Sequence, residues 1–441
     1  MKNALQGRKT ELPTRKEDSS QGVLPDLTWI LYDRVMRALL ICPDTPSDAA
    51  NQTGLTRRLG LFVSAIGRIA DEIEMLYFAP ENFIREAPDA ATLSRQQSEF
   101  WRRNVRATLA PLARRRENYL NHYVLPTLSA RHHPFFHAYS GPRQVAAVTE
   151  RLRQKPDLVF VQRLAAMLPV LQTNMTLPSV FFDLDDVEHK ARLRLALAPP
   201  RYPGKYAHVA QIPAIHLAER RATRLARAAF VCSELDQRHL GRLGLKRLHV
   251  VPNAVAIPDE KYPVAPEKTV MFIGNYGHAP NIRAAERLVR RIWPAVRNAV
   301  PDARLLIAGS PPEALPSSKN PPGGVSFLGF VPDLAALYAL SRVVCCPVTE
   351  GGGTRVKIIE AGAHGRPVVS TRVGAEGLNF TDKSEIILVD SDKDISRACI
   401  ALLNDPERCE TLGAAIQDKV YRAYNPERII SSIADVIKAN F

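Results

Sequence analysis

The chain lacks the sequence features that mark metal-binding, redox and membrane-spanning proteins. Its 441 residues include six cysteines, none of them in a CxxC pair, so the spacing of zinc and dithiol sites is missing. No apolar run approaches the roughly 20 residues of a membrane-spanning helix, and the N-terminus is too polar for a secretory signal. We therefore expect a cytoplasmic protein with reduced thiols.

Several familiar catalytic motifs are missing as well. The sequence has no Walker A loop, no GxSxG nucleophile elbow, no HExxH motif and no strict GxGxxG. Hydrolase, ATPase and metalloprotease functions therefore have no motif to support them.

Positive charge, in contrast, is abundant. The chain has 59 Lys and Arg residues against 45 Asp and Glu residues, a net charge of +14, and such an excess favours polyanionic partners such as anionic lipid or a diphosphate. The Arg-rich stretches at 114–116 and 220–227 are typical of solvated helix faces, and a patch for peripheral contact with the inner face of an anionic membrane is the alternative. No interleaving of aromatic and basic residues is present, so a specific nucleic-acid partner is not expected.

Two successive arrays of short apolar strands and helices indicate an α/β protein with two parallel sheets. The first array, over 37–257, is interrupted by residues 82–155, which are polar, rich in arginine and mainly helical by their period. We interpret that stretch as a helical insertion. The expected strands of the first array lie at residues 38–42, 72–79, 157–162, 179–183, 229–232 and 249–255.

A Pro- and charge-rich linker at 258–268 precedes the second array, over 269–424. Residues 1–36 read as an N-terminal tail, and for a last helix within 425–441 a return to the first domain stays open. Two doubly wound sheets predict a ligand cleft near the carboxyl ends of their strands. The expected strands of the second array begin near residues 269, 303, 325, 342, 367 and 385, with helices at 282–300, 334–341 and 355–365.

The most informative segment follows the buried strand VVCCP. Three glycines at 351–353 precede a helix that is predicted to begin near Thr354, and glycine backbones at a helix start favour an anion such as a phosphate. Arg355 and Lys357 add two cations there. Lys357 and Glu360 share one helix face about 4.5 Å apart along the axis, which suits the phosphates and ribose hydroxyls of a nucleoside diphosphate. An ordinary glycine turn with a surface Lys–Glu pair is the alternative.

Four segments between residues 270 and 378 resemble one known family. In order they read FIGNYGHAPNIRAAERLV, WPAVRNAVPDARLLIAGS, VSFLGFVPDLAALY and GGGTRVKIIEAGAHGRPVVSTRVGAEGL. Together they resemble the retaining glycosyltransferases of family 4, also called glycosyl transferases group 1. In the first half, FFDLDDVEHKARLR and FVCSELDQRHL resemble segments of members that build surface polysaccharides. The resemblance implies a GT-B fold, in which two Rossmann-like domains with doubly wound parallel sheets face a cleft.

The resemblance also implies an activity. A sugar would pass from a UDP-, GDP- or ADP-linked donor to a glycan or lipid-linked acceptor with retention of anomeric configuration, and without a metal or other cofactor. A non-catalytic nucleotide-sugar-binding or scaffold protein of the same fold and a sugar-nucleotide epimerase are the alternatives.

The family's residues for the sugar donor map onto this sequence by position. Glu360 matches the glutamate that holds the ribose, and Arg355 and Lys357 lie where phosphate contacts are expected. Many members carry a further glutamate where this chain has Gly352, whereas Glu350 stands two residues earlier here, and the segment GNYGHAPN carries no cation. The other matches form the loops around the diphosphate and sugar (Gly352, Gly353, Thr354), beside the base (Gly329, Phe330, Val331) and after the first strand (Gly274, Asn275).

In the first domain, the segment FFDLDDVEH places acids where a parallel sheet presents its site. Asp183 and Asp185 are predicted on one face of a continuing strand, with Asp186 and His189 on the following loop or helix start. We select Asp186 as the catalytic residue that faces the cleft, with Asp185 and His189 as alternates. Helix capping is the other interpretation of these acids. Residues 51–54 (NQTG) are the only candidate for a glycine-rich loop in the acceptor domain.

Overall fold

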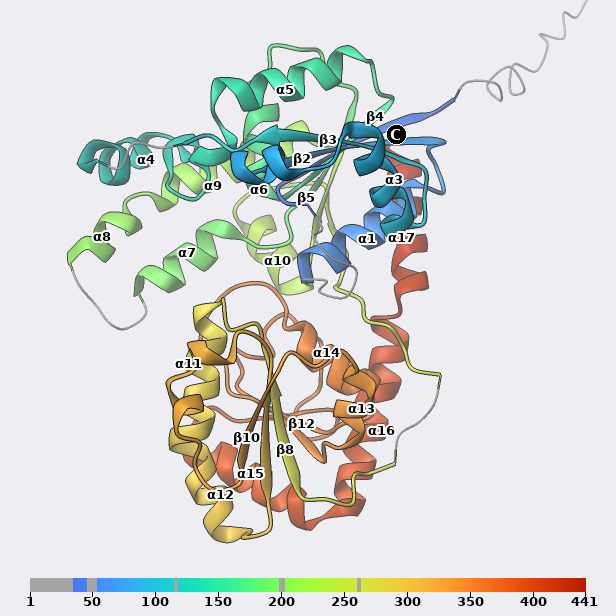
Figure 1. Ribbon diagram of the computed structural model, residues 1–441. Coiled ribbons are helices and arrows are strands. Elements are labelled where there is room, and N and C mark those ends of the chain that lie inside the picture. The colour runs from blue at the N-terminus through green and yellow to red at the C-terminus, as the bar shows by residue number, and fades with distance from the viewer. Residues whose placement is uncertain (1–34, 46–53, 115–117, 198–202, 260–262) are drawn as a thin grey trace, which may run out of the picture. The chain divides into compact units, whose positions relative to one another are not determined.

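A computed structural model of the protein describes residues 35–45, 54–114, 118–197, 203–259 and 263–441 (Figure 1). Most of the expected N-terminal tail (1–36) and of the NQTG segment (51–54) lies outside these ranges. Within them, no helix combines the length and the apolar character needed to span a membrane.

The first domain is built on a seven-stranded parallel sheet with the order β3-β2-β1-β4-β5-β6-β7. Strand β1 sends Leu39 and Ile41 into one hydrophobic core and Leu40 and Cys42 into the other, because successive side chains of a strand point to opposite faces. Both faces are therefore buried under helices, as a parallel sheet requires. The strands are β1 (Arg37–Cys42), β2 (Glu72–Ala79), β3 (Val105–Pro111), β4 (Leu158–Gln162), β5 (Ser179–Asp183), β6 (Ala228–Val231) and β7 (Leu248–Val250).

Helices α1 and α3 contribute to the core on one face of this sheet, and α5, α6, α9 and α10 to the core on the other. The α-helices of the first domain are α1 (Gly54–Ile66), α2 (Glu81–Glu86), α3 (Ala90–Trp101), α4 (Leu125–Leu128), α5 (Pro142–Arg153), α6 (Arg163–Val170), α7 (Glu188–Leu197), α8 (Pro203–Val209), α9 (Ile212–Leu225) and α10 (Glu234–Arg242).

The stretch 82–155 is mainly helical, as expected, but it also includes one strand. It contains β3, which pairs with β2 over its whole length at the edge of the sheet. Through β3, the stretch forms one edge of the sheet. Strand β3 has a weak sequence signal because Arg106 is exposed and Pro111 ends the strand, both of which are typical of sheet edges.

The second domain has a six-stranded parallel sheet with the order β10-β9-β8-β11-β12-β13. The helix expected at 282–300 consists of α11, a π-helical turn at Leu288–Ile292 and α12. The strands are β8 (Thr269–Ile273), β9 (Arg304–Ala308), β10 (Val325–Gly329), β11 (Val343–Cys346), β12 (Val368–Ser370) and β13 (Ile387–Leu388), and the α-helices are α11 (Ala279–Arg287), α12 (Trp293–Ala299), α13 (Leu334–Ala339), α14 (Val356–Ala363), α15 (Asp392–Asn404) and α16 (Pro406–Ala423).

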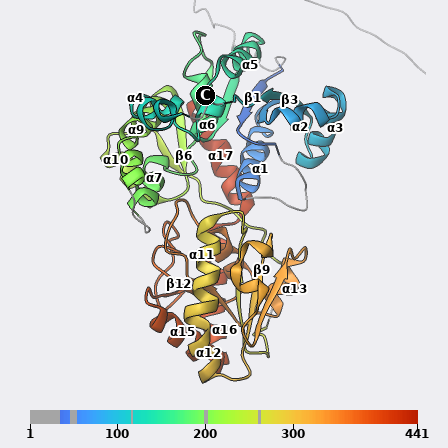
Figure 2. The same ribbon diagram turned by 60° about the vertical axis from the view of Figure 1, so that its left-hand side comes forward.

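The last helix, α17 (Pro426–Asn440), packs in the core of the first domain. Ile429, Ile433 and Ile437 form an apolar stripe along it and join the same cluster as Phe62 of α1. Helix α17 lies beside α1 in both views (Figures 1 and 2). The chain therefore returns to the first domain at its end.

Candidate functional site

The loops that follow β8, β9 and β10 interlock at the carboxyl edge of the second sheet. The Gly274 amide donates to the Ala308 carbonyl at 3.0 Å, and the Gly309 amide donates to the Gly329 carbonyl at 2.7 Å. Gly309 has φ +127°, and a Cβ at this position would lie 1.7 Å from the Gly274 carbonyl oxygen, so only glycine fits. Two of the predicted glycines, Gly274 and Gly329, therefore flank the end of β9 at one edge of the sheet.

The residues expected beside a base follow β10 directly. Gly329 has φ +64°, and Phe330 exposes half of its surface, while Val331 packs partly against the core. An exposed aromatic ring at the carboxyl edge offers a flat apolar surface for stacking.

The glycine loop after β11 takes conformations that other residues avoid. Gly351 has φ +101° and Gly353 has φ +64°. Gly352 lies against the first domain, because a Cβ there would be 2.2 Å from Asp186 Oδ1. The space that a side chain at position 352 would need is therefore taken by an aspartate of the first domain.

Arg355 precedes α14 and folds back onto this loop. Its guanidinium donates to the carbonyls of Gly353 at 2.8 Å, Glu350 at 3.0 Å and Gly352. Burial lowers the pKa of Arg355 from its usual value. The side chain that we expected to face phosphate thus braces the carbonyl side of the loop in this structure.

Lys357 is a residue of α14, and its side chain reaches the turn after β8. Its Nζ donates to Asn281 Oδ1 at 2.9 Å and sits 4.3 Å from the centre of the Phe272 ring. A Cβ on Gly274 would come within 3.3 Å of this ammonium group. Burial, with a smaller contribution from the Arg355 charge, lowers the pKa of Lys357 to about 8. Gly274 and Lys357, which we selected from separate motifs, therefore lie side by side, and the Lys357 ammonium group is desolvated.

Glu360 lies on the same helix as Lys357 and faces a hollow of about 530 Å³ that Tyr338 and Arg57 also line. The hollow draws on α1 and α17 of the first domain as well as on α13 and α14. Glu360 accepts a hydrogen bond from Arg57 in an ion pair, and its side chain remains 14% exposed. The expected ribose-binding carboxylate thus opens to a cavity, with an arginine that sequence analysis missed as its present partner.

Glu350 pairs with a cation that sequence analysis missed. Its carboxylate accepts from Arg283 of α11, a side chain that is half exposed. His278, at the start of α11, lies in the same field: burial and the nearby charges of Arg355 and Lys357 lower its pKa. Arg283 therefore supplies positive charge on this side of the loop, beyond the segment GNYGHAPN in which we looked for it.

The acids after β5 have separate environments. Strand β5 ends at Asp183, so Asp185 does not continue it as expected. Asp183 is fully buried and accepts from Arg58 at 2.6–3.0 Å. Asp185 accepts two bonds from Arg163 Nε at 2.9 and 3.0 Å. Arg163 has φ +69°, a strained value for a residue with a side chain.

Asp186 differs from its neighbours because no hydrogen bond or ion pair to its carboxylate is formed within the described ranges. Burial, together with the charge of Asp185, raises the pKa of Asp186 to about 6. The carboxyl group faces Gly352 across the two domains. Of the three candidates in this loop, Asp186 alone therefore has a carboxylate that is not committed to a partner among the residues described.

His189, the third candidate, is occupied within the first domain. Its Nδ1 contacts Glu219 of α9, and its Nε2 lies 3.0 Å from Nε2 of His239 on α10. Both ring nitrogens are thus shared with other side chains.

Further contacts join the two sheets around the same loop. Thr354 Oγ1 accepts from Asn253 Nδ2 at 2.8 Å, and Arg194 of α7 donates to Glu376 at 2.6 Å. Thr354, predicted to contact the diphosphate and sugar, is therefore also held by a residue of the first domain.

Comparisons with solved structures identify the fold. The fold is similar to that of HepE from Anabaena in complex with UDP (14% identity, 92% of this chain and 100% of that chain covered, TM-score 0.62). It is also similar to sucrose-phosphate synthase from Thermosynechococcus elongatus (18% identity, 92% and 99% covered, TM-score 0.67) and to TarM of S. aureus (12% identity, 92% and 99% covered, TM-score 0.64). The chain thus has the GT-B fold, with seven- and six-stranded parallel sheets.

Residues 267–405 match the model of the family described as "Glycosyl transferases group 1". This range contains the glycine loop, Lys357 and Glu360. No curated protein matches the sequence.

Proposed function

We propose that the protein is a glycosyltransferase that moves a sugar from a nucleotide-sugar donor to an acceptor hydroxyl. The observation that carries the proposal is the convergence of the glycine loop, the Lys357 ammonium and the Gly274 turn at one sheet edge, with Glu360 one turn further along the same helix. The match of residues 267–405 to group 1 glycosyltransferases supports it.

The donor diphosphate would lie at the start of α14. Unpaired N–H groups and the helix dipole favour an anion there, and Lys357 adds a full positive charge in a site with little water. Glu360 would accept hydrogen bonds from the ribose hydroxyls, and the Phe330 ring would lie against the base. Because Arg57 forms an ion pair with Glu360 in the free protein, the ribose would either bind Glu360 beside that arginine or displace it.

We further propose the chemistry of family 4: retention of configuration and no metal. The bond between the anomeric carbon and the diphosphate oxygen breaks, and the acceptor oxygen bonds to the same face of that carbon. The acceptor proton passes to the departing diphosphate, whose charge Lys357 and the start of α14 stabilise. Asp186, opposite Gly352, would orient the acceptor hydroxyl by accepting its hydrogen bond.

UDP-sugars are the first donors to test, because structures of HepE and of a TarM mutant were solved in complex with UDP; GDP- and ADP-sugars complete the set. For the acceptor we propose a glycan or a lipid-linked glycan. Similar folds include WaaG, a glycosyltransferase involved in lipopolysaccharide biosynthesis. Peripheral contact with an anionic membrane remains part of this proposal.

A second candidate function is a nucleotide-sugar-binding protein without transfer activity. It is favoured by Arg355, which is turned onto loop carbonyls, and by Gly352 at the position of the second family glutamate. The two functions differ in turnover: a transferase moves a mass-tagged sugar from the donor to a cell-membrane acceptor, and a binding protein leaves the donor intact.

The binding step can be tested by titrating the nucleotide-sugars into wild-type protein and Glu360→Gln. Loss of a charged hydrogen-bond acceptor should weaken binding about tenfold or more. Glu313→Gln, at an exposed position of the same domain, serves as the matched control and should bind like wild type. Full affinity in Glu360→Gln would refute the assignment of this residue.

A further inference from the structure

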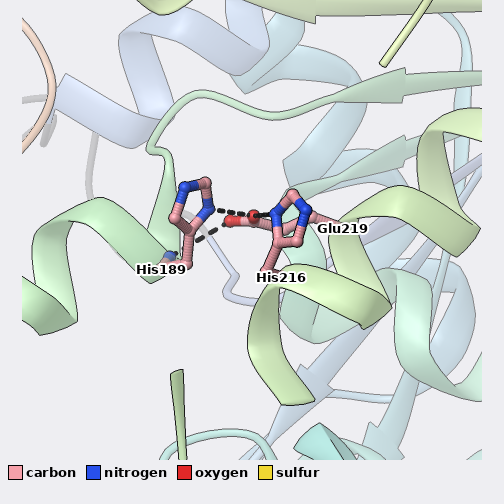
Figure 3. Close-up of side chains that lie close together, drawn as sticks. All are labelled: His189, His216 and Glu219. Atoms are coloured by element: carbon pink, nitrogen blue, oxygen red, sulfur yellow. Dashed lines mark hydrogen bonds and ion pairs between the residues drawn. The ribbon is translucent and has the colours of Figure 1, made fainter. Parts of the chain in front are cut away.

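Three side chains of the first domain converge on one point away from the nucleotide site. His189 comes from the first turn of α7, and His216 and Glu219 come from α9 (Figure 3). One nitrogen or oxygen of each lies within 4.8 Å of the others. Among the residues that the structure describes, no other group of three His, Cys, Asp or Glu side chains converges in this way.

The sequence of α9 explains half of this arrangement. His216 and Glu219 are three residues apart, so their side chains stand on the same helix face. The α7 contribution is fixed by the backbone as well as the ring, because the His189 amide donates to Glu219 Oε1 at 3.2 Å. Two helices therefore hold three potential ligands in defined positions.

Among the described residues, two histidine rings and one backbone amide meet the charge of Glu219. Its carboxylate is fully buried, and no Lys or Arg pairs with it among the described residues. His189 Nδ1 contacts Oε2, whereas His216 Nδ1 lies 3.9 Å from the same oxygen and forms no hydrogen bond. A buried carboxylate is costly unless a cation neutralises it, so the cluster has the chemistry of a cation site.

The outer partner of His189 fits metal ligation. Its Nε2 lies 3.0 Å from Nε2 of His239, with the two rings stacked at 5.2 Å. A histidine that binds a metal through Nδ1 carries its proton on Nε2 and donates it to an acceptor, which fixes the ring. The His239 nitrogen accepts that hydrogen bond in the tautomer that carries its proton on Nδ1.

We propose that His189 Nδ1, His216 Nδ1 and Glu219 bind a divalent transition-metal ion of the zinc type. Bonds of about 2.0–2.1 Å in tetrahedral geometry put ligand atoms about 3.3 Å apart. The His216–Glu219 separation of 3.9 Å is slightly wider than this, and the His189–Glu219 contact is narrower. Rotation of side chains within the cluster would place the ion between them, with water as a fourth ligand.

The ion would be structural and lies outside the proposed transfer reaction. It would tie α7 to α9, and α7 begins two residues after Asp186. The acidic loop opposite Gly352 would thus be anchored from behind. The resemblance to family 4 implies no metal, and no sequence pattern indicates this cluster, because His189 is 27 positions from the nearer α9 ligand and no local motif joins them.

The test is titration of Zn(II) and Co(II) into full-length protein stripped of metal with a chelator. We expect one Zn(II) per chain, and for Co(II) the visible absorption of a tetrahedral site. His216→Ala should weaken binding by at least about 100-fold, and Glu219→Gln should do the same. His249→Ala, at a histidine of β7 outside the cluster, is the matched control and should bind like wild type.

Circular dichroism identifies any variant that fails to fold. We expect His216→Ala to fold, because His216 Nδ1 forms no hydrogen bond that the substitution would remove. Zinc binding far below one ion per chain, or equal binding by wild type and folded His216→Ala, would overturn the proposal. The readout is metal content, so either result leaves the proposed transferase function to its own test.

Discussion

The loops that follow β5 and β11 occupy equivalent places at the carboxyl edges of their sheets, but they are built from opposite materials. The loop after β5 carries carboxylates, and Arg58 and Arg163 hold two of them. The loop after β11 carries glycines, two of them at positive φ, and leads into α14. The comparison shows that the first domain neutralises two of its own acids and leaves one carboxylate, Asp186, against the glycine loop of the second domain, where we propose that the donor diphosphate binds.

The largest expected effect concerns the internal neutralisation of the acidic loop. Arg58→Met should lower the free energy of unfolding by about 3–5 kcal/mol, because it leaves Asp183 buried without its cation. Urea denaturation measures the change. The double variant Arg58→Met/Asp183→Leu should recover much of the loss, since no buried charge remains. A single variant as stable as wild type would show that the ion pair does not organise this loop.

Nucleotide-sugar binding at the proposed diphosphate site should depend most on Lys357. We expect Lys357→Ala to weaken nucleotide-sugar binding by about 100-fold, the equivalent of one charged contact to phosphate. Calorimetry measures this, with Lys246→Ala, an exposed lysine of the first domain, as the control. Unchanged affinity in Lys357→Ala would contradict the assignment.

The pH dependence of binding sharpens the same point. The pKa of Lys357 is about 8 in the free protein, so the ammonium charge is present below pH 8 and is lost above it. Affinity for a nucleotide-sugar should therefore decrease by up to about tenfold per pH unit above pH 8. Lys357→Arg should remove that dependence, because arginine stays charged. A flat wild-type profile between pH 7 and pH 10 would argue against a phosphate contact.

The contact between the two loops can be broken by one methyl group. Gly352→Ala places a Cβ against Asp186 Oδ1, where a Cβ would be 2.2 Å away, so the loops must separate, and both donor binding and transfer should fall about tenfold or more. Gly352→Ala/Asp186→Ala removes the collision; donor binding should then return to the wild-type level. Donor binding that stays impaired in the double variant would mean that the methyl group disturbs the loop itself and not the contact.

The last prediction concerns Asp186, the carboxylate that neither arginine holds. The pKa of Asp186 is about 6 against an ordinary 3.8. Its ionisation therefore destabilises the folded protein above pH 6, and this destabilisation is absent below pH 4, where the carboxyl group is protonated. Asp186→Asn should be more stable than wild type at pH 7, and the difference should disappear towards pH 4. Thermal unfolding at the two pH values tests this. Equal differences at both values would show that Asp186 titrates normally.

Much of the fold could be predicted because each buried strand carries its signal locally. Strands β2 and β5 have the expected bounds, and the second array of strands appears in the expected order. Strand β3 was missed because an edge strand with Arg106 and Pro111 has no continuous apolar run. The helix expected at 282–300 is interrupted by a π-helical turn that its apolar period does not reveal.

The candidate site divides in the same way. Gly352, Lys357 and Glu360 belong to one short motif, so local sequence brought them together. The arginine partners of the site's carboxylates come from far along the chain. Arg57 is 303 residues from Glu360, and Arg58 is 125 residues from Asp183. Such pairs arise from the arrangement of domains and leave no periodic pattern. Arg283 had a weak signal, as an arginine in the helix that follows GNYGHAPN.

The most direct test of the central claim is hydrogen–deuterium exchange with and without a nucleotide-sugar that binds. We predict slower exchange in peptides covering 274–283 and 350–360, with peptides from α5 and α9 unchanged. Binding measured in the same solution without slower exchange at 350–360 would contradict the account, because the nucleotide-sugar would then be held elsewhere.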